Sequence, residues 1–551
     1  MCTTMIITKG ATQDGSMMVT HSDDDELSDQ RIIFVPAQDH APNAMRDVIQ
    51  GENDRYPRIV SKKRGPGYDT PGFHETRVIG QIPQVLHTFA YFDGNYGIMN
   101  EHNLMIGECT NNAKYMPTHV TKEQAIAQGK HERLFYSSEL SRIALERCSK
   151  AREAVKLMGH LIDTYGYFST GETLLVADED EAWVFEMCAL PHETYHSAWV
   201  AQKVPDGQVF VAANEFRIRE IVFDRPENFL HSSHLIQGLE AVQWVNPDER
   251  PIDWLRAVST GEYYHPYYAL RRVWRVLDRV NPDLGLSPWV EDPYTSAYPF
   301  AVTPKTRLET RDVFALYRDH YEGTQFDLTK GVAAGPNGDP SRYVGPYDCH
   351  AFDLTGQKLR GAWERPISVF YQGYTYVAQT RPSAPELMKG VLWFGPDVAY
   401  TTCFTPFPTK VSNLPRSYQI GSTKKLDRNV AWWAFDFVAN WAKLNYQRMT
   451  RVDILPLQKK LEDMQFNRVQ EWTEQFKRPS AVALKKLTEQ CNANAAEIQQ
   501  QWWDLADTLV AKYSGGYINL PGQDAVEIGY PSDWLGNTNY SQGPVDYDIK
   551  L

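Results

Sequence analysis

The sequence predicts an α+β protein with a helical C-terminal extension. Over roughly the first 420 residues, short β-branched and apolar runs alternate with segments of helical spacing, which indicates a body that mixes strands and helices. After about residue 425 the pattern becomes helical. We therefore expect one large body over residues 2–424 and a helical extension with an irregular tail over 425–551.

Strands are predicted from the second residue onward. Residues 2–8 and 17–20 are rich in β-branched and apolar types, and the turn-forming sequence Lys-Gly-Ala-Thr-Gln-Asp-Gly-Ser separates them. This pattern predicts a hairpin. Further strands are predicted at 85–92, 104–107, 172–177, 181–187, 208–213, 367–377 and 390–394.

Helices are predicted at 132–165, 309–322 and 457–477, and a long one follows them. An apolar seam of about three and a half heptads runs from Leu484 to Leu509. We favour an amphipathic helix that covers the body or pairs with the 457–477 helix. A dimerising coiled coil is the alternative, and a homo-oligomer is therefore possible.

Composition excludes several classes of protein. The 551 residues carry a net charge of −13 and no basic block, which argues against a nucleic-acid partner. The sequence has no run of about 18 apolar residues, the length that would indicate a membrane-spanning helix. The seven cysteines are dispersed and form no CxxC pair, which argues against a zinc ribbon and suits a reducing compartment. We expect a cytoplasmic protein without a metal or an organic cofactor.

Cys2 is the residue with the most distinctive chemistry. Because cysteine is small, an aminopeptidase can remove Met1 and leave Cys2 with a free α-amine. Unperturbed pKa values are about 7.7–8.0 for the amine and about 8.5 for the thiol, so the amine can take the thiol proton near neutral pH. Nucleophile and base would then belong to one residue. An incidental buried cysteine is the alternative.

The chain opens with Cys2-Thr3-Thr4, Asp14-Gly15-Ser16 and His21-Ser22-Asp23-Asp24. This opening resembles that of the C69 dipeptidase family, which is related to penicillin V acylase, bile salt hydrolase and the secernins. Similar family stretches are Met99-Asn100-Glu101 with Leu104, Gly171-Glu172 with Glu181-Ala182-Trp183-Val184-Phe185-Glu186, Ala213-Asn214-Glu215-Phe216-Arg217-Ile218, and Trp393-Phe394-Gly395-Pro396-Asp397. The resemblance implies the αββα sandwich of the N-terminal nucleophile (Ntn) hydrolases.

The resemblance also implies roles for individual residues. Cys2 matches the nucleophile, Asp24 an aspartate that holds the α-amine, and Asn214 an oxyanion donor. Alternatively, the acidic run 23–26 is a solvated loop or calcium turn, and Asn214 caps the following segment. Thr110 and Asn111 fall where related acylases make a second oxyanion or substrate contact.

Three further residues are candidates for substrate binding. Asn100 matches the family, although an Asn-Glu pair before a strand can simply build a turn. His21 stands where relatives usually carry arginine, so we expect weaker, pH-dependent stabilisation of the thiolate, or else a structural strand-end residue. Arg365 is a candidate for binding a substrate carboxylate, and a surface ion pair is its alternative.

These predictions converge on a cysteine-type dipeptidase that acts on small peptides through a thioester. An acylase or acyltransferase acting on N-acyl amides is an alternative on the same site. A catalytically silent, secernin-like interaction protein is a third.

Overall fold

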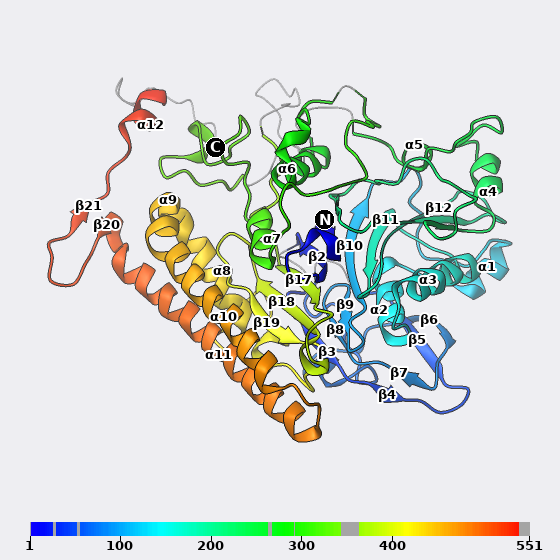
Figure 1. Ribbon diagram of the computed structural model, residues 1–551, viewed down its shortest axis with the longest axis horizontal. Coiled ribbons are helices and arrows are strands. Elements are labelled where there is room, and N and C mark those ends of the chain that lie inside the picture. The colour runs from blue at the N-terminus through cyan, green and yellow to red at the C-terminus, as the bar shows by residue number, and fades with distance from the viewer. Residues whose placement is uncertain are drawn as a thin grey trace.

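The computed structural model describes residues 2–25, 29–51, 55–262, 267–290, 292–342 and 363–538. Within them, two antiparallel sheets form the centre of the molecule (Figure 1). The first sheet has the order β16 (Ala301–Val302), β14 (Val209–Ala212), β1 (Cys2–Ile7), β2 (Met17–Asp23), β17 (Tyr374–Thr380), β18 (Gly390–Pro396) and β19 (Thr405–Pro408). The second has the order β15 (Phe229–His231), β13 (Ser197–Lys203), β12 (Ala182–Ala189), β11 (Gly171–Ala177), β10 (Met105–Asn111), β9 (Gly97–Asn100), β8 (Tyr91–Asp93) and β3 (Ile33–Val35).

Helices and short strand pairs surround these sheets. The helices are α1 (Lys122–Gln128), α2 (Ser137–Arg147), α3 (Ala151–Tyr165), α4 (Leu235–Ala241), α5 (Trp254–Val258), α6 (Leu270–Val280), α7 (Thr310–Tyr317), α8 (Ala431–Ala442), α9 (Tyr446–Met449), α10 (Leu455–Gln475), α11 (Ala481–Lys512) and α12 (Ser532–Asn537). The short strands pair as β4 (Gln38–Asp39) with β7 (His87–Thr88), β5 (Met45–Ile49) with β6 (Val78–Pro83), and β20 (Tyr517–Ile518) with β21 (Val526–Glu527). The α+β prediction is confirmed.

The N-terminal hairpin forms as predicted. In the turn, the Asp14 carboxylate accepts hydrogen bonds from the backbone N–H and the hydroxyl of Ser16, at 3.0 and 2.6 Å. Gly15 between them has φ of +75°, a conformation that favours glycine. The resulting register places Cys2 opposite Asp23.

The two sheets face each other closely. Strands β1 and β2 of the first contact β10 and β11 of the second. At Gly107 of β10, a Cβ atom would lie 2.6 Å from the Thr4 hydroxyl and 2.8 Å from the Thr20 carbonyl. Only glycine therefore permits this approach of the sheets.

Helices cover the outer sides of both sheets. The α2–α3 pair packs on the eight-stranded sheet, while α7, α8, α10 and α11 lie against the seven-stranded one (Figure 1). The single helix predicted at 132–165 is wrong in one respect, because it is interrupted after Cys148. The Asp178 carboxylate accepts the N–H of Ala151 at 2.8 Å and thereby starts α3 anew. This cap comes from a distant strand end, so local periodicity could not reveal it.

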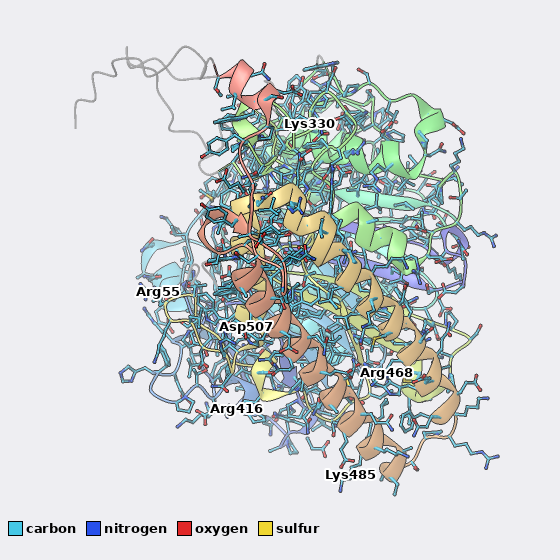
Figure 2. The ribbon with its side chains drawn as sticks, turned by 90° about the vertical axis from the view of Figure 1, so that its left-hand side faces the viewer. Arg55, Lys330, Arg416, Arg468, Lys485 and Asp507 are labelled. Atoms are coloured by element: carbon cyan, nitrogen blue, oxygen red, sulfur yellow. The ribbon has the colours of Figure 1, made fainter. Side chains whose placement is uncertain are left out.

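The apolar seam of α11 is buried within the chain. Leu487, Cys491 and Ala495 belong to the main core cluster together with Trp472 of α10. The two helices run side by side in Figure 2, and the Asn494 amide of α11 donates to the Gln465 oxygen of α10. The favoured interpretation of this seam is thus confirmed.

The predicted strand at 367–377 begins late, at Tyr374. The Gln372 side chain donates to the carbonyl of Ile367 at 2.9 Å and accepts from the N–H of Ala399 at 2.9 Å. These bonds hold the preceding segment in a loop, although its composition is typical of a strand.

The division at residue 424–425 stays a prediction. The helices beyond it share core clusters with the sheets, since α10 and α11 both contact β19. None of the helices in the described ranges is long and apolar enough to cross a membrane.

We expect Trp502→Ala to destabilise the protein strongly. Trp502 is fully buried and stacks on Phe435, with ring centroids 5.4 Å apart. Truncating such a side chain costs about 3–5 kcal/mol of unfolding free energy. Urea denaturation followed by far-ultraviolet circular dichroism measures the change in unfolding free energy. Val482→Ala, at a side chain that is 78% exposed, is the control and should change stability by less than about 0.5 kcal/mol. A similar midpoint for both variants would contradict the packing described for α11.

Candidate active site

The ends of four strands meet at Cys2. Cys2 begins β1 and pairs with Asp23 at the end of β2. Ala212 at the end of β14 lies opposite Thr4, so the chain reaches Asn214 two residues later at the same end of the sheet. The facing sheet contributes the C-terminal part of β10, beginning at Glu108. The antiparallel register thus gathers residues that are far apart in the sequence.

The Cys2 thiol is buried and hydrogen-bonded. Its Sγ donates to Oε2 of Glu108 at 3.0 Å, and its carbonyl accepts from Nη1 of Arg272 at 2.9 Å. Burial and the negative charge of Glu108 raise the pKa of the thiol well above its ordinary value. This environment by itself therefore favours the thiol over the thiolate.

Glu108 connects several groups of the site. Its Oε1 accepts from the Thr110 hydroxyl at 2.7 Å, and its backbone carbonyl lies 2.9 Å from Nδ1 of His21. Burial and the nearby Glu108 raise the pKa of Glu172 well above its usual range. Burial opposes the charge of Glu108 as well, but Glu172 and His21 lower its pKa on balance. Burial and the closeness of the two carboxyls thus oppose ionisation of both at once.

Asn214 is held in one orientation by two arginines. Its Oδ1 accepts from Nη2 of Arg272 at 2.7 Å and from Nη1 of Arg365 at 3.1 Å, while Nδ2 donates to the Thr110 carbonyl at 2.7 Å. Its φ is +65°, a left-handed conformation that asparagine tolerates better than most residues. The N–H groups of this amide are thus directed away from the arginines and toward the Thr110 carbonyl.

The segment after Asn214 is fixed by a buried glutamate. The Glu186 carboxyl accepts the backbone N–H of Arg217 at 2.7 Å. Burial raises the pKa of Glu186 to about 7. Two of the motif stretches in the sequence therefore meet through this contact.

Arg272 projects from the first turn of α6. The Glu262 carboxylate accepts hydrogen bonds from the N–H groups of Ala269 and Leu270 at 2.9 and 2.8 Å. It thereby provides acceptors for backbone N–H groups that have no partner within the helix at its N-terminus. From there Arg272 reaches the Cys2 carbonyl, the Thr3 hydroxyl and Asn214.

Asp24 and Arg365 form a buried ion pair. Their burial corrects two alternatives from the sequence, a solvated acidic loop at Asp23 and Asp24 and a surface ion pair at Arg365. Asp23 and Asp24 are 3% and 2% exposed, because β2 carries them between the sheets. Glu26 lies outside the described residues.

Two of the predicted substrate contacts are engaged elsewhere. The Asn100 amide donates to the carbonyls of Leu145 and Cys148, and its oxygen accepts the N–H groups of His102 and Leu104. Its oxygen therefore builds a turn and its amide group holds the end of α2, so all of its hydrogen-bonding capacity is used away from Cys2.

Asn111 likewise points its amide at another side chain. Its Nδ2 donates to the Thr173 hydroxyl at 2.6 Å. By contrast, Thr110 and His21 lie within the cluster around Cys2.

Sequence reasoning missed Glu108, Glu172 and Arg272 as members of this site. Each left a signal. Glu108 follows the apolar run Leu-Met-Ile-Gly, Glu172 opens the strand Glu-Thr-Leu-Leu-Val-Ala, and Arg272 stands beside Leu270 and Val273 in a helix. Charged residues in such apolar elements are buried, so they need a partner or a task.

Cys2, His21 and Asp23 offer ligand atoms that all lie within 4.8 Å of one another. Thiolate, imidazole and carboxylate suit a zinc ion chemically. The sequence prediction of no metal site considered only local spacing, which does not reveal a set assembled by pairing β1 with β2.

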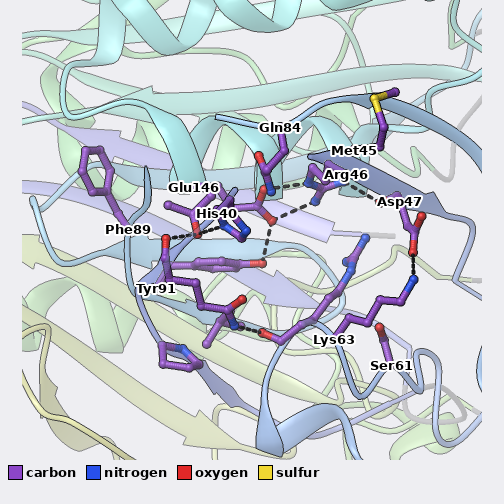
Figure 3. Close-up of a pocket in the computed structure, with 15 residues that line it drawn as sticks. His40, Met45, Arg46, Asp47, Ser61, Lys63, Gln84, Phe89, Tyr91 and Glu146 are labelled. Carbon is purple, nitrogen blue, oxygen red and sulfur yellow. Dashed lines mark hydrogen bonds and ion pairs between the residues drawn. The ribbon is translucent and has the colours of Figure 1, made fainter. Parts of the chain in front are cut away.

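A separate hollow lies between the β5–β6 hairpin and α2 (Figure 3). Its charges are paired with one another: Arg46 donates to Glu146 at 2.6 Å, and Lys63 bonds Asp47 at 2.9 Å. None of the residues predicted for catalysis or substrate binding lines it.

Comparison with known proteins identifies the class of this chain. The model of peptidase family C69 matches residues 1–458, which is most of the sequence. The chain is therefore a peptidase. More specifically, it belongs to peptidase family C69, as its resemblance around Cys2 implied.

Curated relatives resemble it over most of their length. The chain is 25% identical to the "Probable dipeptidase" of Latilactobacillus sakei, over 93% of this chain and 95% of that protein. It is 24% identical to "Dipeptidase A" of Lactobacillus helveticus, over 81% and 82% of the two chains. It is 21% identical to the "Dipeptidase" of Bifidobacterium longum, over 78% and 75%.

We expect Glu108→Gln to lower the pKa of the Cys2 thiol. The change removes a negative charge 3.0 Å from Sγ that opposes the thiolate. The rate of alkylation by iodoacetamide, followed by mass spectrometry as a function of pH, should therefore rise at lower pH than in the wild type. Glu474→Gln, at a side chain that is 73% exposed, is the control and should leave the profile unchanged. A profile that is unchanged in Glu108→Gln would show that this carboxylate does not influence the thiol.

Proposed function

We propose that the chain is a cysteine-type dipeptidase with Cys2 as its nucleophile. The observation that carries this proposal is the set of contacts that hold Cys2 where the strand ends meet: its thiol donates to Glu108, and its carbonyl accepts from Arg272, which also holds Asn214. The dipeptide preference is supported by the family and by the names of the relatives.

Removal of Met1 would provide the base. The α-amine of Cys2 takes the thiol proton, and the thiolate attacks the carbonyl carbon of the substrate. A positive α-ammonium beside Sγ then offsets the negative carboxylates that otherwise raise the pKa of the thiol. Asp24 is positioned near this end of β2 to orient the amine.

Asn214 and a backbone N–H stabilise the oxyanion of the tetrahedral intermediate. The intermediate collapses when the C–N bond breaks, and the protonated α-amine gives its proton to the departing amine. Water, deprotonated by the same α-amine, attacks the thioester. Cleavage of the C–S bond releases the acid and restores the thiol. The scheme uses no metal and no organic cofactor.

The fold fits this mechanism. The order helix, sheet, sheet, helix is the one that the Ntn-hydrolase αββα sandwich requires, with a nucleophile at the start of a central strand. The six cysteines in the described ranges are free thiols, which suits a reducing, cytoplasmic location.

An N-acyl amide acylase would use the same nucleophile and differ in the group it binds beside the carbonyl. A secernin-like, non-catalytic protein would have no need to hold Asn214 with two buried arginines. We therefore favour the dipeptidase.

Cys2→Ala should abolish dipeptide hydrolysis, because the variant lacks the thiol that forms the thioester. Release of free amino acids, measured by chromatography, tests this. Cys148→Ala is a matched control at another buried cysteine, and it should keep activity. Intact mass spectrometry of the wild type should show the loss of Met1. Retained activity in Cys2→Ala, or an active enzyme that keeps Met1, would rule out the proposed nucleophile and base.

Asn214→Ala should lower kcat by about 10²–10³-fold, the effect of losing one oxyanion donor. KM for the dipeptide should change little, since the interaction forms mainly in the transition state. Steady-state kinetics separate the two parameters. Asn111→Ala is the matched control on the neighbouring strand end, because its amide is directed at Thr173. A loss in KM alone would argue for ground-state binding in place of oxyanion stabilisation.

A further inference from the structure

Two buried glutamates lie next to the nucleophile on adjacent strands. Glu108 of β10 and Glu172 of β11 are both 0% exposed, and Glu172 pairs in register with Thr110. The Thr110 hydroxyl and the Cys2 thiol both donate to Glu108. The chain therefore buries one carboxyl group beside Sγ and a second one next to it on the adjacent strand, where charge is costly without a partner.

Several buried acceptors around this pair lack a donor. Among the described residues, no N–H or O–H group donates to Oδ1 of Asp24 or to Nε2 of His21, and Glu172 has as neighbours only the neutral Tyr136 hydroxyl and the Glu108 carboxyl for its hydrogen bonds. Nδ1 of His21 faces the Glu108 carbonyl and so carries the proton, which makes Nε2 an acceptor when the ring is neutral. The neighbouring Arg272 is already bonded to Cys2, Thr3 and Asn214.

A set of acceptors without donors calls for a ligand that brings donors and positive charge. We propose that Glu108 and Glu172 form the subsite that binds the α-ammonium group of the substrate's first residue. This inference rests on the proposed function and specifies the substrate of that site: a peptide with a free N-terminus. An ammonium group offers three N–H donors, and its charge allows both carboxyls to ionise.

The geometry of a dipeptide agrees with this placement. Its α-nitrogen lies two bonds from the carbonyl carbon, about 2.5 Å away. That carbon approaches the nucleophile to about 3–3.5 Å before attack. The α-nitrogen is then within about 6 Å of Sγ. Because Oε2 of Glu108 lies 3.0 Å from Sγ, the α-nitrogen and this carboxylate lie in the same region.

The subsite would separate dipeptides from N-acyl amides. An acyl group or a hydrogen atom in place of the ammonium leaves the two buried carboxyls without the positive charge that would let both ionise. Sites built to hydrogen-bond a polar group reject analogues that lack it by large factors, here at least about 100-fold. The same two residues would therefore distinguish a dipeptidase from an acylase.

The test compares three substrates that share one leaving amino acid: alanyl-phenylalanine, its des-amino analogue propanoyl-phenylalanine, and N-acetyl-alanyl-phenylalanine. We expect wild-type kcat/KM to be at least about 100-fold higher for the dipeptide than for either analogue. Glu172→Gln should lower kcat/KM for the dipeptide by about 10–100-fold more than it lowers kcat/KM for propanoyl-phenylalanine. Glu172→Asp, which keeps the charge, should retain part of the preference.

Two controls separate substrate binding from a structural effect. Glu146→Gln changes another buried glutamate, which pairs with Arg46 at the separate hollow, and should preserve the ratio between substrates. The rate of Cys2 alkylation in Glu172→Gln should match that of the wild type, which shows that the nucleophile is in place.

Equal hydrolysis of dipeptide and des-amino analogue by the wild type would overturn the subsite, as would an unchanged ratio in Glu172→Gln. Neither result would affect the nucleophile, which Cys2→Ala tests separately. Conversely, dipeptide hydrolysis by Cys2→Ala would overturn the proposed mechanism even if the requirement for a free amine held. If Glu172→Gln does not fold, the ratio of kcat/KM for the dipeptide to that for the des-amino analogue is measured in Glu108→Gln. A ratio as high as in the wild type would count against the subsite.

Discussion

The structure depends on the arginine that ties three chain segments together at the ends of the strands. Arg272 donates to the Cys2 carbonyl, to the Thr3 hydroxyl and to Asn214, and it is fully buried. Its charge can be buried only because these acceptors are present and because Glu262 satisfies the start of its helix. The same contacts fix the backbone of the nucleophile and the orientation of the amide that faces it. Loss of this arginine would therefore affect packing and chemistry together.

The electrostatics around the thiol are unfavourable to a thiolate in the unprocessed chain. Burial and the Glu108 carboxylate raise the pKa of Cys2, and Asp23 and Asp24 act in the same direction. A positive charge beside Sγ would reverse this balance, and a freed α-amine provides one once it has taken the thiol proton. The carboxylates that oppose the thiolate are also the groups suited to an ammonium ligand. Acidic surroundings alone disfavour a nucleophilic thiolate. Two positively charged amines, one from Cys2 and one from the substrate, would offset the carboxylates and make these surroundings consistent with a reactive thiol.

Local sequence patterns predicted the strands and helices well where composition or periodicity is strong, as in the fully buried strands of the N-terminal hairpin and the apolar seam of α11. They were less accurate where distant side chains decide. Asp178 starts a second helix inside the predicted 132–165 segment, and Gln372 delays a strand that the composition favoured. Asn100 matched the family pattern, yet its amide group bonds the distant end of α2. In each case at least one hydrogen bond joins residues far apart in the sequence, which the local pattern does not connect.

The sequence by itself determined the family, the α+β class and the importance of Cys2, because these follow from short motifs and from a chemistry that one residue carries. Only the tertiary structure decided which residues surround the thiol. Glu108 is 106 positions from Cys2 and Arg272 is 270 positions away, and both reach it because antiparallel strand ends and one helix start meet at the same place. No local pattern encodes that convergence. Burial then gives these charges their effect, because a carboxylate that would be ordinary in water alters the pKa of a thiol once both are removed from solvent.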